Sequence, residues 1–232
     1  MKDLFGKALL DFQNGNYSED IMTSTNISDE DALPIPYLFR DYKDMPKLEQ
    51  KALKLSKGSI LDVGCGSGSH SLYLQKKGFK IKAIDISKGA IEVTKQRGVL
   101  KANVLNILDE TETFDTILLL MNGTGIFQEL TQVSKYLSHL KSLLNPNGQI
   151  LIDSSDIKYM YEDEDGGYWM DMNSSYYGEL DYFLSYKGEK EAPMKWLYLD
   201  FETLKLACET VGLKCELVLE GAHFDYLAQL SL

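Results

Sequence analysis

The sequence predicts an α/β fold built on a largely parallel sheet, and three observations support this prediction. An apolar strand at 60–63 runs directly into a glycine-rich turn and then a helical pattern. A second strand at 80–86 follows after a single helix, which is the order that a parallel strand-helix-strand crossover requires. Residues 114–121 form a nearly unbroken apolar run, as expected of a parallel strand buried on both faces.

The turn after the first of these strands has the character of a nucleotide-cofactor loop. Asp62 ends the strand, and Gly64, Gly66 and Gly68 follow at alternate positions. Glycines there allow a tight turn and a close ligand approach, while the next helix begins with unpaired N–H groups. The dinucleotide fingerprint would need a sixth-position glycine where Ser69 stands, and no Gly-Lys-Ser or Gly-Lys-Thr follows as in a phosphate-binding loop.

A second acidic residue marks the same edge of the predicted sheet. Asp85 lies at the carboxyl end of the strand at 80–86, where open α/β sheets bind ligands, and its carboxylate can accept from both ribose hydroxyls. One helix, at 69–77, separates the two strands and is closed by Gly78. The alternative, in which Asp85 is a turn residue or caps the helix beginning near Ser87, is less favoured because the glycine loop lies at the right distance.

These segments resemble the first motif and the following strands of the class I S-adenosylmethionine (SAM)-dependent methyltransferases. The strand at 101–105 resembles their third strand, with Asn103 where the family often has an Asp that contacts adenine, and the run at 114–121 resembles the fourth. Asn122 is then a candidate contact near the methyl group; its alternative is a simple turn rich in Asn and Gly. The resemblance implies SAM as cofactor, S-adenosylhomocysteine (SAH) as product, and cofactor contacts at Asp62, Gly64, Cys65, Gly66, Gly68, Asp85, Ile86, Asn103, Val104 and Asn122.

The rest of the chain fits the same architecture. A helix is expected at 127–144, a break at 145–148 and a fifth strand at 149–153. Near the end, a helix at 201–211 with Asp200 as its cap precedes two strands, at 214–220 and 224–230. The resemblance covers 58–157 strongly and 198–232 weakly. It implies a Rossmann-like, seven-stranded, mostly parallel sheet with helices on both faces and a C-terminal antiparallel hairpin.

We expect one domain with four parts: an N-terminal cap (1–45), a SAM-binding core (46–157), a substrate or lid insertion (158–197) and the end of the core (198–232). Within the insertion, residues 176–186 show the alternating pattern of a strand, and a second strand-like segment follows at 194–199. This pattern predicts an inserted β-hairpin lid. Such a hairpin would also serve for dimerisation, so the expected state is a monomer or a homodimer. The insertion is rich in aromatic residues, at Tyr159, Tyr161, Tyr168, Trp169, Tyr176, Tyr177, Tyr182, Phe183 and Tyr186.

Composition excludes several classes of partner. Among 232 residues, 24 basic and 35 acidic side chains give a net charge of −11, which disfavours nucleic acid because its binding needs Lys and Arg against phosphates. No Asp-Pro-Pro-Tyr or Asn-Pro-Pro-Tyr signature of the amino-directed enzymes is present. Neither a signal peptide nor a membrane span is expected, so the predicted location is cytoplasmic. Three cysteines without metal-ligand spacing predict neither a zinc site nor a disulfide framework.

The function that these observations favour is methyl transfer from SAM to a small molecule, by in-line attack of its nucleophile. The aromatic and acidic insertion suits a cationic or amine-bearing acceptor. The favoured alternative is that the aromatic residues pack the hairpin onto the sheet and that the acidic run at 162–165 is a solvated turn. His70, His139 and His223 are the histidines, and none is assigned as a catalytic base. The alternatives are a protein or peptide methyltransferase, a non-catalytic scaffold of the same fold, and an oxidoreductase with an atypical glycine loop.

Overall fold

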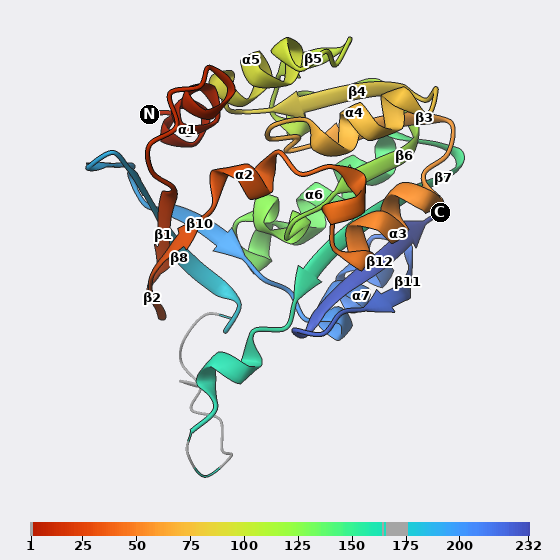
Figure 1. The fold of residues 1–232 in the computed structure, drawn as a ribbon. Coiled ribbons are helices and arrows are strands. Elements are labelled where there is room, and N and C mark those ends of the chain that lie inside the picture. Colours follow the sequence, from red (N-terminus) through yellow and green to blue (C-terminus); the bar gives the residue numbers. More distant parts are fainter. Residues whose placement is uncertain (1, 164, 166–175) are drawn as a thin grey trace.

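The computed structural model describes residues 2–163, 165 and 176–232, and a seven-stranded sheet forms its centre (Figure 1). The strand order is β11-β12-β7-β6-β3-β4-β5. Strands β7 to β5 pair in parallel, while β12 is antiparallel to both β7 and β11, so the predicted mostly parallel sheet with a terminal hairpin is confirmed. The bounds are β3 Ser59–Val63, β4 Lys80–Asp85, β5 Ala102–Val104, β6 Phe114–Leu119, β7 Leu144–Ser155, β11 Lys214–Glu220 and β12 Asp225–Ser231.

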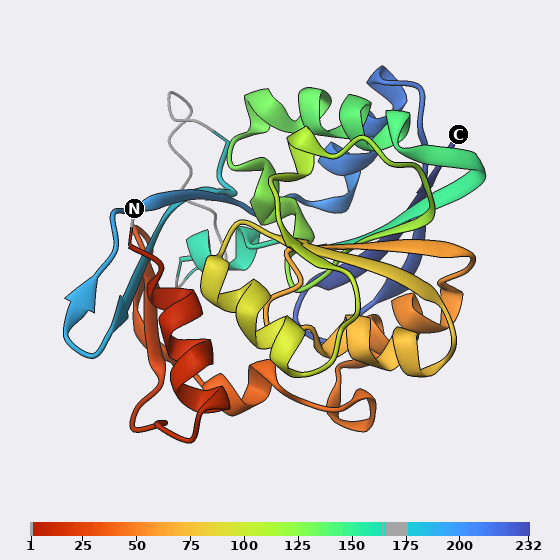
Figure 2. The ribbon, with the colours of Figure 1, turned by 90° about the horizontal axis from the view of Figure 1, so that it is seen from above.

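Helices cover both faces of this sheet (Figure 2). Helices α6 and α7 pack on one face, where their apolar side chains join the largest buried cluster. Helices α3 and α4 cover the other face together with α5, over separate buried clusters. Their bounds are α3 Lys47–Leu55, α4 Ser69–Lys76, α5 Lys88–Gln96, α6 Val133–Ser142 and α7 Phe201–Thr210.

Two predicted helix starts have the expected side-chain caps. The hydroxyl of Ser87 accepts from the backbone N–H of Ala90 at 2.9 Å, and a carboxylate oxygen of Asp200 accepts from that of Thr203 at 2.9 Å. Each cap satisfies a donor that the first helical turn leaves free. These bonds fix where α5 and α7 begin, just after β4 and after the insertion.

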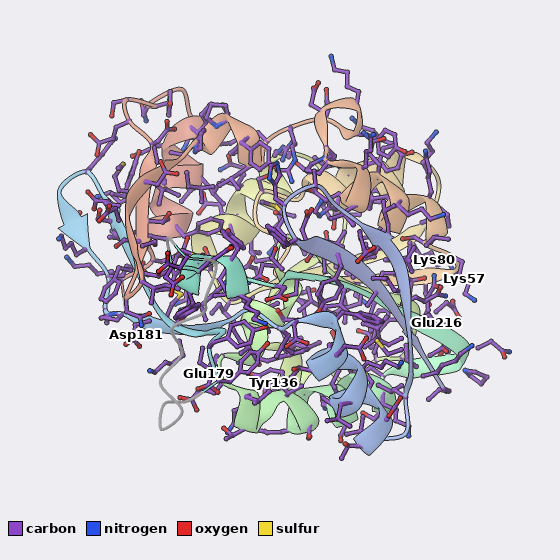
Figure 3. All side chains as sticks on the ribbon, turned by 90° about the horizontal axis from the view of Figure 1, so that it is seen from below. Lys57, Lys80, Tyr136, Glu179, Asp181 and Glu216 are labelled. Carbon is purple, nitrogen blue, oxygen red and sulfur yellow. The ribbon has the colours of Figure 1, made fainter. Side chains whose placement is uncertain are left out.

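A second sheet of five short strands lies beyond the carboxyl ends of the parallel strands (Figure 1). The predicted hairpin of the insertion forms, because β10 pairs antiparallel with β8. A hairpin from the N-terminal segment also joins it: Met22 pairs with Ser185 and Thr25 with Tyr182. Figure 3 shows Glu179 and Asp181 of β8 at the opposite end of the molecule from Lys57 and Lys80. The bounds are β1 Ile21–Thr25, β2 Ser28–Leu33, β8 Glu179–Tyr186, β9 Glu189–Lys190 and β10 Met194–Leu197.

The helix expected at 127–144 is wrong in its boundaries. Two short 3-10 turns, η3 (Gly123–Phe127) and η4 (Leu130–Gln132), come first, and α6 begins only at Val133. The expected break at 145–148 lies within β7, where the pairing with β6 jumps from Leu144 to Gln149. The polar residues there therefore form an irregularity at the start of the strand instead of a loop before it.

The N-terminal segment folds against the core through a helix that the sequence analysis did not predict. Helix α1 (Leu4–Gln13) crosses α5 with backbone-to-backbone contact, since a Cβ placed on Gly89 would lie 2.5 Å from the carbonyl carbon of Gly6. The carboxylate of Asp3 caps α1 at Gly6 and also accepts from the N–H of Gly89 at 2.9 Å. Helix α1 is thereby held next to the end of β4. No helix within the described ranges is long and apolar enough to cross a membrane.

Candidate functional site

The sheet has its topological switch point between β3 and β6. From β3 the chain moves outward through β4 and β5, and from β6 it moves outward in the other direction through β7. Where the loops after two neighbouring strands run in opposite directions, a crevice forms at the carboxyl ends of these strands. Open α/β sheets bind ligands in such a crevice. The glycine loop after β3 and the segment after β6 form the two sides of this crevice.

The glycine loop adopts the open conformation that its sequence predicts. Gly64 and Gly66 both have positive φ, 68° and 53°, which costs other residues conformational energy. A Cβ on either glycine would meet no protein atom closer than 3.4 Å, so protein packing does not explain their absent side chains. The open side of the loop is available to a ligand. Cys65 points instead into a buried cluster, and burial raises the pKa of its thiol.

Asp62 and Asp85 flank the loop at the ends of β3 and β4. Asp62 is buried and accepts from the hydroxyl of Ser71 at 2.6 Å; burial raises its pKa, partly offset by the nearby charge of His70 and by Ser71. Asp85 accepts the N–H of Gly66 at 3.0 Å and that of Ser87 at 2.8 Å. Burial also raises the pKa of Asp85. Because a carboxylate has about four acceptor positions, Asp85 keeps roughly two for a ligand.

Apolar side chains next to Asp85 remain uncovered. Ile86, just after β4, is 72% exposed, and Val104, at the end of β5, is 47% exposed. Asp85 pairs with Val104 and Ile84 with Asn103 across the two strands, which places Asn103, also exposed, beside them. Burying such apolar surface against a flat ligand would gain about 25 cal/mol per Å². The residues predicted at the ends of β3, β4 and β5 therefore lie along one edge of the sheet, at the carboxyl ends of these strands.

The segment after β6 has an unusual backbone. Met121 and Asn122 have φ values of 67° and 61°, although neither is glycine. Asn122 is half-buried, and its amide oxygen accepts from the hydroxyl of Ser154 at 3.0 Å. On β7, Asp153 accepts the N–H groups of Met121 at 3.0 Å and Gly123 at 2.9 Å. Asn122 therefore lies just after β6, at the switch point, with part of its amide used in holding the segment in place.

A buried charged cluster that the sequence analysis missed lies beside the loop. Nε2 of His70, in the first turn of α4, is 2.6 Å from Oε2 of Glu49 on α3, and Arg40 pairs with the other oxygen of Glu49. Burial would raise the pKa of Glu49, but the hydrogen bond and charge of His70 and the charge of Arg40 lower it. Burial would lower the pKa of His70, but Glu49 and Asp62 raise it. Both pKa shifts favour the ionic form of the pair.

Arg40 belongs to a short segment that is tied to the glycine loop. This segment follows α2 (Ile35–Leu38), and the carbonyl oxygen of Leu38 accepts from the hydroxyl of Ser69 at 3.1 Å. The guanidinium lies over the ring of Tyr37, 3.9 Å from its centroid, and Tyr37 is 40% exposed. Nε of Arg40 is buried without a hydrogen-bond partner among the described residues. No sequence signal links Arg40, Glu49 and His70, because they come from three separate elements.

The second sheet closes over the segment after β6. Trp196 of β10 packs on the backbone of Gly125, where an added Cβ would lie 2.3 Å from its Cε2 atom. The hydroxyl of Thr124 donates to the carbonyl oxygen of Leu197 at 3.0 Å. The ring of Tyr182 lies 5.4 Å from that of Trp196. The N-terminal hairpin and the insertion together therefore form the roof over this side of the crevice.

Other predicted residues have structural contacts. The hydroxyls of Tyr176 and Tyr177 donate to Asp200 and Asp156, at 2.6 and 2.9 Å, so these rings pack the insertion onto the core. His139 contacts the carbonyl oxygen of Ile107 at 2.8 Å. Tyr168 and Trp169 lie outside the described residues. Within 2–163, 165 and 176–232, no group of three or more His, Cys, Asp or Glu side chains is arranged to hold a metal ion.

Comparisons with known proteins identify the family of this chain. A family model described as a methyltransferase domain matches residues 37–218. A crystal structure of a SAM-dependent methyltransferase from Bacteroides fragilis in complex with SAH is 45% identical, with a TM-score of 0.93, and the match covers 100% of this chain and 95% of that one. A SAM-dependent methyltransferase from Clostridium acetobutylicum, 16% identical with a TM-score of 0.58 over 83% of this chain and 92% of that one, shares the fold.

A curated relative, the ubiquinone biosynthesis O-methyltransferase of Rickettsia typhi, is 31% identical over 107 residues, which are 43% of this chain and 42% of that protein. The chain thus spans less than half the length of this curated relative. The family model covers most of the chain and the Bacteroides structure covers all of it. With the glycine loop and the switch-point crevice, these matches show that the chain belongs to the class I SAM-dependent methyltransferases.

Proposed function

We propose that this enzyme transfers the methyl group of SAM to a hydroxyl oxygen of a small molecule. The observation that carries the proposal is the position of the open glycine loop at the switch point between β3 and β6. The glycine loop lies on one side of this point, and on the other side the second sheet is seated on Gly125 through Trp196. A crevice covered in this way would exclude water and orient two reactants, which is what methyl transfer needs.

The residues at the crevice fit SAM. Gly64 and Gly66 leave room for close backbone approach, and Asp85 has acceptor positions left for ribose hydroxyls. Ile86 and Val104 offer apolar surface for the adenine, beside Asn103. The unpaired Nε of Arg40 is a buried donor that a carboxylate would satisfy, as the methionine part of SAM offers. Asp62, Gly68, Asn122 and the backbone of Cys65 complete the proposed contacts.

When bound, SAM supplies an electrophilic methyl carbon attached to a sulfur that leaves as a neutral thioether. The residues of this chain bind and orient: the glycine loop fixes one side of the crevice and the Met121–Asn122 turn the other. No side chain is assigned as a base. Two titratable groups beside the crevice, His70 and Asp153, are held in hydrogen bonds, His70 to Glu49 and Asp153 to two N–H groups. Orientation and exclusion of water are the contributions that the geometry supports.

The choice of a small hydroxylated acceptor has two supports. The curated relative named above is an O-methyltransferase. The net charge of −11 disfavours nucleic acid. The hydroxyls of Tyr176, Tyr177 and Tyr186 are bonded to Asp200, Asp156 and Asp11, so these hydroxyls hold the fold together. An amine-bearing acceptor and a basic peptide are the alternatives that the test must separate.

A cytoplasmic location and a monomeric or homodimeric state complete the proposal. The three cysteines are free and buried, as is usual in a reducing compartment. The test is a screen in which purified enzyme and SAM are incubated with matched small molecules bearing a hydroxyl, an amine or a carboxylate, and with a basic peptide. Mass spectrometry should find one added methyl group on hydroxyl compounds. Methylation of the peptide alone, or of amines alone, would reject the proposed acceptor class.

A further inference from the structure

The turn that leaves β6 is held in a conformation that its own residues do not favour. Met121 and Asn122 both have left-handed φ values, and Met has no side-chain hydrogen bond to stabilise such a φ. Residues in this region persist only where the surroundings impose it, and they concentrate at functional sites. This turn forms one side of the cofactor crevice, so whatever imposes its conformation also shapes that crevice.

Asp153, on the neighbouring strand β7, is the group that holds the turn. Its two carboxylate oxygens accept one N–H each, from Met121 at 3.0 Å and from Gly123 at 2.9 Å, so the bonds bracket Asn122. The side chain belongs to a residue that is only 8% exposed. An ionised carboxylate makes stronger bonds to N–H groups than a neutral acceptor does. Two such bonds, one on each side of Asn122, fix the backbone of the turn.

We propose that Asp153 is a positioning residue of the cofactor site, whose ionised carboxylate holds the Met121–Asn122 turn in the shape that SAM and SAH require. Protonation of Asp153 loosens the turn and weakens cofactor binding. This role rests on the cofactor alone and holds for any methyl acceptor.

The surroundings of Asp153 place its titration close to neutral pH. Burial raises its pKa to about 6, while the N–H groups of Gly123 and Met121 oppose the rise. Glu49 on α3 raises the pKa further and His70 on α4 lowers it. Tyr37 on α2 and Tyr226 on β12 also lie within electrostatic range of the carboxylate, and burial raises the pKa of both phenols, so both are neutral at neutral pH.

An asparagine cannot replace this carboxylate. The amide has a single oxygen, and its NH₂ group would face an N–H donor where the second carboxylate oxygen now accepts. Asp153→Asn therefore loses one bond, weakens the other and cannot titrate. Asp115→Asn is a matched control, because Asp115 also accepts a backbone N–H, from Ser59 at 2.7 Å, but at the amino end of β6, away from the crevice.

The test is calorimetric titration of the whole chain with SAH at about pH 7.5 and at about pH 5, for wild type and both variants. With a pKa of about 6, roughly a tenth of Asp153 is ionised at the lower pH, so wild-type affinity should fall about tenfold. Asp153→Asn should bind at least tenfold more weakly at about pH 7.5 and should lose most of the pH dependence. Asp115→Asn should follow wild type. Wild-type affinity and pH dependence in Asp153→Asn would overturn the proposal.

A second measurement needs no variant. In ¹H–¹⁵N spectra of the wild-type chain, the amides of Met121 and Gly123 should shift together with pH, with a common midpoint near the pKa of Asp153. The amide of Ser59, bonded to Asp115, should not shift in that range, because its N–H bond lowers the pKa of that carboxyl. Shifts at Met121 and Gly123 that stay flat between about pH 5 and about pH 7.5 would overturn the proposal even if Asp153→Asn does not fold.

Discussion

Nε2 of His70 lies 2.6 Å from Oε2 of Glu49, and this buried pair joins helix α3 to the first turn of α4, directly behind the glycine loop. Breaking a buried pair by removing one partner leaves the other charge unpaired. We predict that Glu49→Gln lowers the free energy of unfolding by about 3 kcal/mol, because both Arg40 and His70 lose their carboxylate. Urea unfolding measures this loss.

Two further variants make this prediction specific. In Glu49→Gln/His70→Asn, the loss should be smaller than the sum of the single losses, since the two residues interact. Lys195→Ala is the control: its ion pair with Asp181 is exposed and screened by solvent, so this variant should unfold close to wild type. Additive losses in the double variant would show that the pair is not coupled.

The same pair predicts a pH dependence of stability. The pKa of His70 is raised above its ordinary 6.5, so its contribution is fully present below about pH 6.5 and is lost as pH rises through the folded value. The pKa of Glu49 is lowered, so its contribution is present above about pH 4.5 and is lost as pH falls through the folded value. When unfolding is measured across pH, His70→Asn should not show the loss of stability that wild type shows as pH rises. If His70→Asn still shows that loss, His70 is not its source.

Substitutions of glycine can separate the effect of backbone strain on stability from the effect of an added side chain on cofactor binding. Gly66 and Gly78 both have positive φ, 53° and 91°, and neither would bring a Cβ closer than 3.8 Å to protein atoms. Alanine at either position should cost a similar 1–2 kcal/mol of stability. Only Gly66→Ala should weaken SAH binding, by tenfold or more, because only Gly66 belongs to the loop that we propose as a cofactor contact. Calorimetry and thermal unfolding on both variants check this, and equal binding would exclude close approach at Gly66.

The roof depends on the contact between Trp196 and Gly125. Gly125→Ala should destabilise the fold by about 1–3 kcal/mol, since its Cβ would overlap the indole. In Gly125→Ala/Trp196→Ala, the added methyl has room, so the double variant should lose less than the sum of the two single losses. Urea unfolding of the four proteins measures the coupling. A coupling of zero would mean that the indole does not sit on Gly125.

How far the sequence predicts the fold depends on how local each signal is. The strands and caps of the core are coded by neighbouring residues, as the Ser87 and Asp200 caps show. Neighbouring residues do not predict the pairing of Met22 with Ser185, because this pairing joins two hairpins that lie far apart in the sequence. The helix expected from residue 127 begins at Val133 because the chain first turns under the roof at Gly125.

The residues of the candidate site also divide into those with a local sequence signal and those without one. The glycine loop and Asp85 could be predicted because spacing along one strand-turn-helix unit carries their signal. The pairing of Arg40, Glu49 and His70 could not, since each residue is an ordinary member of its own element. Asp153 had no signal either: an acidic residue ending a strand has many explanations, and its bonds to Met121 and Gly123 arise from the neighbouring strand.

We propose that the edge of the sheet at Asp85 binds the cofactor. Calorimetric titration with SAM, SAH and NAD should show binding of the first two and none of NAD. Asp85→Ala should weaken SAH binding by ten- to a hundredfold, because hydrogen bonds to a charged group contribute about 1.5–3 kcal/mol. Glu216→Ala, at an exposed carboxylate on β11 far from β8 (Figure 3), should bind as wild type. Unchanged SAH affinity in Asp85→Ala, or binding of NAD in place of SAH, would contradict the account.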